Sequence, residues 1–106
     1  MISIETLHLD LPAIQDASLN PRAALYGVVS SGNLEVLVEP ASDATRCFFA
    51  VETTAHGFTE VWQAVLTDFA ARHPVGGLSF SIHDAGATPA VVSLRLDQAF
   101  QSLRSS

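Results

Sequence analysis

Residues 24–39 read ALYGVVSSGNLEVLVE, two β-prone runs joined by a short polar segment. From Leu34 onward, apolar side chains alternate with glutamates, which is the pattern of a half-buried strand. The joining segment at 30–33 is Ser-Ser-Gly-Asn, small and turn-prone, and its Gly and Asn tolerate a positive φ. This stretch predicts a tight β-hairpin with Ser31 at or beside its tip.

Three further strands and one helix are predicted around this hairpin. Residues 2–9 alternate loosely, residues 46–53 form the most apolar run, and Leu78, Phe80 and Ile82 alternate with polar neighbours. Apolar residues follow helical spacing over 58–72, and His73-Pro74 marks the end of that helix. Segments rich in turn-forming residues at 12–22 and 40–45 are predicted as loops.

The last segment is compatible with two structures. The valines of Ala90–Leu96 would suit a strand, whereas Thr88 offers an N-cap oxygen and Pro89 suits the first position of a helix. We favour the helix. The expected fold is therefore α+β: a four- to five-stranded, mostly antiparallel sheet with two amphipathic helices on one face, in a single domain spanning residues 1–106.

Composition narrows the class of protein. Eleven acidic and five basic residues give a net charge of −6, which argues against a nucleic-acid binder and against a protein held on an anionic membrane. Only 15% of the residues are charged, compared with about 25% in an average soluble domain, so we expect part of the surface to face another protein. The longest apolar run, Cys47–Val51, is too short for a membrane helix. The absence of a signal-peptide pattern and the single cysteine fit a cytoplasmic protein.

No catalytic or metal-binding motif emerges from the residues themselves. His8, His56, His73 and His83 are scattered without ligand spacing, so no metal site is expected. Cys47 is interpreted as a small buried hydrophobe. Ser30 and Ser31 lack the glycines of a nucleophile elbow, and His83-Asp84 is interpreted as a strand that ends in an Asp-containing turn.

Several stretches resemble one known family. Residues 26–37, Tyr26 to Leu37, resemble the prosthetic-group segment of the malonate decarboxylase acyl carrier proteins, which are the delta subunits of that enzyme. Residues 58–66 are similar to the central helix of that family, and 72–74 and 83–92 continue the likeness in the same order. The resemblance extends over about residues 24–103. The carrier subunit of citrate lyase is a more distant relative, which shares the Ser-Gly-acidic turn and an Asp-x-Gly-Ala element.

The resemblance implies a cofactor and a role. In that family the serine of the Ser-Gly-Asp/Asn turn carries 2′-(5″-phosphoribosyl)-3′-dephospho-CoA through a phosphodiester, and the matching residue is Ser31. Asn33 stands where many relatives have Asp, which keeps the turn propensity. The implied role is that of a non-catalytic carrier of acetyl and malonyl thioesters. The implied partners are the malonyltransferase and decarboxylase subunits and the transferase that attaches the group. Arg22 and Arg46 are candidates for neutralising its phosphates, and the sequence does not decide between them.

Three other functions stay open at this point. The chain could be the carrier subunit of citrate lyase, although the serine of that relative lies nearer its N-terminus. It could be a protein-interaction domain that is never modified. It could also be a small hydrolase that uses Ser31, His83 and Asp84.

Overall fold

The computed structural model describes residues 4–14, 27–31 and 33–104, with backbone only for 27–31 and 102–104. In this part of the chain, strands form one five-stranded sheet in the order β1-β4-β5-β3-β2. Their bounds are β1 (Glu5–Pro12), β2 (Gly27–Ser31), β3 (Leu34–Pro40), β4 (Arg46–Thr53) and β5 (Leu78–Asp84). Strands β4 and β5 run parallel, and the other three neighbouring pairs are antiparallel. The predicted α+β, mostly antiparallel sheet is confirmed.

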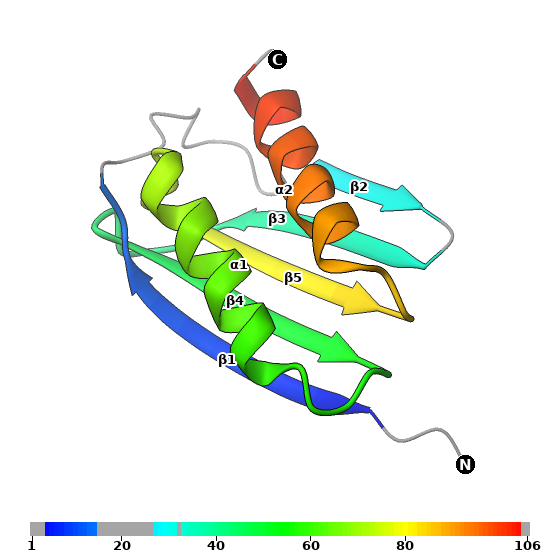
Figure 1. Cartoon of the computed structure of the whole chain (residues 1–106). Coiled ribbons are helices and arrows are strands. Elements are labelled where there is room, and N and C mark those ends of the chain that lie inside the picture. Colours follow the sequence, from blue (N-terminus) through cyan, green and yellow to red (C-terminus); the bar gives the residue numbers. More distant parts are fainter. Residues whose placement is uncertain (1–3, 15–26, 32, 105–106) are drawn as a thin grey trace.

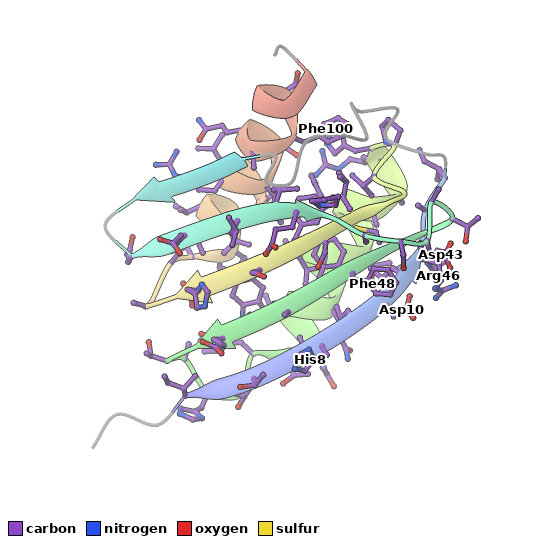
Figure 2. The ribbon with its side chains drawn as sticks, turned by 180° about the vertical axis from the view of Figure 1, so that it is seen from behind. His8, Asp10, Asp43, Arg46, Phe48 and Phe100 are labelled. Atoms are coloured by element: carbon purple, nitrogen blue, oxygen red, sulfur yellow. The ribbon has the colours of Figure 1, made fainter. Side chains whose placement is uncertain are left out.

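Both helices cover the same face of this sheet, as predicted (Figure 1). Helix α1 (Thr59–Arg72) connects the parallel strands β4 and β5, and helix α2 (Pro89–Arg104) follows β5. Seen from behind, the opposite face of the sheet is open in the described part of the chain (Figure 2). No helix among the described residues is long and apolar enough to cross a membrane.

The core lies between the sheet and the two helices. Alternate residues of β3, β4 and β5 are almost completely buried, because successive side chains of a strand point to opposite faces. Phe80 of β5 is at the centre of the aromatic part of this core. Its ring stacks on Phe49 with centroids 5.1 Å apart and meets Phe69 of α1 edge-on at 5.4 Å. Trp62 and Phe69 are buried in α1, as the helical spacing predicted.

The ends of the helices follow local chemistry. The hydroxyl Oγ1 of Thr88 accepts a hydrogen bond from the backbone N–H of Val91 at 3.3 Å, and Pro89 is the first residue of α2. The helix is thus confirmed and the alternative strand over 90–96 is wrong. Helix α1 ends at His73, whose extended backbone is the conformation favoured before Pro74.

The ends of β1, β2 and β3 differ from the sequence prediction. Strand β3 includes Pro40, which was expected in a loop. Ser30 and Ser31 belong to β2 and pair with Glu35 and Leu34, so only two residues remain between the strands. Strand β1 continues to Pro12, which was expected in a loop. Pro12 pairs with Arg46 of β4. Because β1 is an outer strand of the sheet, the N–H that proline lacks is tolerated there. The rest of the predicted loop, at 15–22, and the predicted strand residues 2, 3 and 24–26 lie outside the described residues.

Candidate functional site

The strand register brings one residue from each of the five strands into a single row. The row runs Glu5, Thr53, Asp84, Leu34, Ser31 in the order of the strands across the sheet. It forms because the carboxyl ends of the parallel strands β4 and β5 meet at one end of the sheet, where β2 also ends (Figure 1). We call this the Ser31 end of the sheet. With strands about 4.8 Å apart, the backbone of Ser31 lies about 10 Å from that of Asp84.

Asp84 holds this end together. Its side chain is buried, and its Oδ2 accepts a hydrogen bond of 2.8 Å from the hydroxyl of Thr53. Its Oδ1 accepts the backbone N–H groups of Gly86 at 3.2 Å and Ala87 at 2.7 Å. The Thr53 hydroxyl in turn accepts the N–H of Ala55 at 3.0 Å. One carboxylate thus joins the end of β4 to the loop between β5 and α2.

The same loop is tied to the hairpin of β2 and β3. The backbone N–H of Ala85 donates to the carbonyl of Asn33 at 2.8 Å. The end of β4 is bonded to the end of β5 in a similar way. The backbone N–H of Thr54, the residue after β4, donates to the carbonyl of Asp84 at 3.1 Å. Asn33, at the β3 side of the turn next to Ser31, is therefore bonded to the residue that follows β5, and the end of β5 is bonded to the residue that follows β4.

A cavity of about 260 Å³ opens at this end, between the first turns of α1 and α2. Its wall is mainly apolar and includes Phe58, Val61, Trp62, Val65, Ala87 and Val92. Among its described lining residues, only Asp84, Thr88 and the indole of Trp62 bring polar side-chain atoms. We call it the interhelical cavity. Two residues of the apolar stripe predicted over 58–72 are not core residues, since Phe58 is 47% and Val61 38% exposed, and both line the cavity.

His83 and Asp84 do not form a catalytic pair. His83 is on the open face of the sheet, where its ring lies between two carboxylates, 3.7 Å from Glu35 and 3.3 Å from Glu52. Asp84 faces the helices, because adjacent residues of a strand point to opposite sides. The hydrolase arrangement of Ser31, His83 and Asp84 is therefore wrong, and the interpretation of Asp84 as a turn residue is confirmed by its bonds to Gly86 and Ala87.

Arg46 is wrong as a partner for phosphates near Ser31. It begins β4 at the opposite end of the sheet, where it forms an ion pair with Asp10 (Figure 2). Arg22, the other candidate, lies outside the described residues.

Other candidate groups are not arranged for catalysis. The Cys47 side chain is fully buried, and burial raises the pKa of its thiol to about 12, which keeps the thiol protonated and unreactive. Within the described ranges, no three His, Cys, Asp or Glu side chains come together as possible metal ligands.

Comparison with known proteins identifies the family. The family model for the malonate decarboxylase delta subunit (MdcD) matches residues 21–103 of this chain. The chain belongs to this family of acyl carrier proteins. A malonate decarboxylase acyl carrier protein of Stenotrophomonas maltophilia is 52% identical over 100 residues, which is 94% of each chain. One from Burkholderia cepacia is 53% identical over 97 residues, 91% of this chain and 87% of the relative.

A solved structure has the same fold. It is a chain of a Pseudomonas malonate decarboxylase hetero-tetramer in complex with malonate, with a TM-score of 0.72 and 40% identity. The match covers 93% of this chain and 98% of that chain. The family that the hairpin and helix motifs indicated is thus confirmed. Sequence reasoning missed the interhelical cavity and the bond between Thr53 and Asp84, and the only signal for either was the Asp-x-Gly-Ala element at 84–87.

Proposed function

We propose that this chain is the acyl carrier subunit of malonate decarboxylase and that Ser31 carries the prosthetic group expected for the family, 2′-(5″-phosphoribosyl)-3′-dephospho-CoA. The main support is the register that ends β2 at Ser31, next to a two-residue turn whose base is bonded to Ala85. A serine at the end of a strand on a fixed hairpin gives a modifying enzyme a defined backbone to bind. The carrier is proposed as one domain over residues 1–106.

The residues at the Ser31 end of the sheet suit the covalent attachment and the uncharged part of the prosthetic group better than they suit its phosphates. A serine hydroxyl has the chemistry to form a phosphodiester, and the interhelical cavity offers an apolar surface. The described ionisable side chains nearest in the strand rows are those of Glu35, Glu52, Asp84 and His83. Ionised phosphates are stable only where they are hydrated or paired with cations, so the phosphates of the arm stay in water or contact basic groups of a partner.

The carrier itself needs no acid, base or nucleophile for the cycle. When bound, the group supplies a thiol that carries acetyl and malonyl groups as thioesters. The chain contributes a rigid hairpin that fixes the point of attachment, and tethering keeps the local concentration of substrate high at each partner site. We propose a non-catalytic role in the cytoplasm, with malonyltransferase subunit, decarboxylase subunits and prosthetic-group transferase as partners. The malonate decarboxylase hetero-tetramer that contains the structural relative supports this assembly.

The intact mass of the chain purified from its own host tests this proposal. We expect a mass increase equal to the dephospho-CoA derivative. Ser31→Ala abolishes the increase, whereas the matched control Ser30→Ala, one residue earlier on β2, keeps it. An increase that persists in Ser31→Ala, or disappears only in Ser30→Ala, refutes the assignment. Co-purification with citrate lyase subunits in place of malonate decarboxylase subunits refutes the assignment to this complex.

A further inference from the structure

We propose that the interhelical cavity is a docking site for the acetyl-thioester end of the arm on Ser31, and that it shields this thioester from water while excluding the malonyl form. This inference rests on the proposed function and adds a binding site on the carrier itself.

The cavity lies at the same end of the sheet as the attachment residue. Asp84, part of its wall, shares the end row with Ser31, separated only by Leu34 of β3. Both helices cover the face of the sheet to which Leu34 and Asp84 belong. The backbone separation of about 10 Å is shorter than an extended pantetheine chain. An arm attached at Ser31 therefore reaches the cavity without any change in the fold.

The size of the cavity fits the terminal part of the arm. An engineered apolar cavity of about 150 Å³ accepts benzene, so the volume of 260 Å³ accommodates roughly ten non-hydrogen atoms. An acetyl group with its sulfur and the adjoining cysteamine amide is of this size. The nucleotide part of the arm is too large and too charged to enter, so it stays outside.

The polarity of the wall distinguishes the two acyl groups. No described lining residue is basic, and the buried carboxylate of Asp84 already accepts hydrogen bonds on both oxygens. The partial positive charge at the start of α1 is met by Glu60 in its first turn. The first turn of α2 has no acidic side chain, but Pro89 lacks an N–H, and the hydroxyl and carbonyl of Thr88 accept the N–H groups of Val91 and Val92. A malonyl carboxylate would lose its hydration beside Asp84 without gaining a cation, whereas a neutral acetyl group loses little.

The mouth of the cavity provides the surface that the arm would cover. Phe58, the residue before α1, and Val61 in its first turn are exposed apolar residues, and both line the cavity. A tethered group is present at millimolar effective concentration, so even a weak site is occupied for much of the time. Shielding of the acetyl thioester slows its hydrolysis between cycles. When the arm leaves the cavity, malonyl replaces acetyl on the thiol with release of acetate, and the malonyl form stays outside the cavity for the decarboxylase.

The first experiment uses the full-length Ser31→Ala chain, in which no arm competes for the cavity. Trp62 is the only tryptophan of the chain and lines the cavity, so its fluorescence reports binding. We expect a saturable change on titration with S-acetyl-N-acetylcysteamine, with its midpoint in the millimolar range. The malonyl counterpart binds at least about tenfold more weakly, because its carboxylate is not neutralised. No saturable change, or equal binding of the malonyl probe, overturns the proposal.

Two variants in which an alanine is replaced by leucine test whether the probe binds in the interhelical cavity. Ala87→Leu, which fills the cavity, weakens acetyl binding by at least about tenfold, whereas Ala64→Leu on the exposed side of α1 leaves it unchanged. If Ala87→Leu does not fold, Val65→Phe fills the same cavity from α1. Acetyl binding that persists in a folded cavity-filling variant overturns the site.

The last measurement is the rate at which the acetyl thioester on the arm is hydrolysed. On the acetylated holo chain, the cavity-filling variant hydrolyses its thioester about fivefold faster than Ala64→Leu does. Equal rates overturn the shielding role. Failure of the proposed function is distinguishable, because it appears as the absence of the mass increase on Ser31 and leaves the titration with free probes unaffected.

Discussion

Loss of the Asp84 carboxylate is expected to destabilise the whole Ser31 end of the sheet. Asp84→Ala leaves the Thr53 hydroxyl and the N–H groups of Gly86 and Ala87 without their acceptor. Gly86 is exposed, so water replaces the carboxylate there at little cost. The Thr53 hydroxyl is buried and the Ala87 N–H is partly buried, and each unsatisfied donor costs about 1–2 kcal/mol. We therefore expect a loss of about 3 kcal/mol in the free energy of unfolding.

Asp84→Asn separates the two groups of bonds. An amide oxygen still accepts the N–H groups of Gly86 and Ala87, while the Thr53 hydroxyl loses its charged acceptor, so the expected loss is about 1–1.5 kcal/mol. The matched control is Asp68→Ala, which removes an exposed ion pair with Arg72 and costs about 0.5 kcal/mol or less.

Urea unfolding with linear extrapolation measures these differences, provided that the m-value does not change. Hydrogen exchange at the Ala87 amide should also become faster in Asp84→Ala. If Asp84→Ala loses no more stability than Asp68→Ala does, the idea that this carboxylate joins β4, β5 and the following loop is wrong.

Three further predictions concern other parts of the chain. Phe80→Ala removes the ring that contacts Phe49 and Phe69 and should cost about 3–5 kcal/mol in thermal or urea unfolding, whereas a cost below 1 kcal/mol would contradict the assigned core. Cys47 should react with a thiol reagent at pH 8 only as fast as the chain unfolds. Burial raises the pKa of the Cys47 thiol to about 12, so the stability contributed by the buried, protonated thiol is complete below the pKa of the unfolded thiol and is lost as the pH rises toward 12. Rapid labelling of the native chain would refute the burial of Cys47. Arg46→Ala should lower stability by about 1 kcal/mol or less and leave the mass increase on Ser31 intact, since the Arg46–Asp10 pair is exposed and lies at the far end of the sheet.

Local patterns in the sequence were sufficient for most of the elements. The alternation in 34–38 and 78–83 and the apolar spacing over 58–72 predicted β3, β5 and α1, because burial on one face imposes the period of each element. Thr88-Pro89 settled the last segment as a helix for a local reason, since an N-cap oxygen followed by proline pre-forms a first turn. The boundaries near Ser31 and Pro12 were missed because pairing with a neighbouring strand extends a strand beyond its own propensity.

The sequence by itself determined the class of fold, the hairpin with its serine, and the resemblance that the comparisons confirmed, since each depends on residues close together along the chain. Only the tertiary structure decided which distant groups meet. The parallel pairing of β4 with β5 brings Thr53 to Asp84 and places Arg46 at the end of the sheet far from Ser31. The interhelical cavity arises in the same way, because α1 and α2 both begin at the end of the sheet where β4 and β5 finish. Strand order and the placement of the two helix starts at the same end of the sheet are global properties of the packed chain, and no local pattern of residues specifies them.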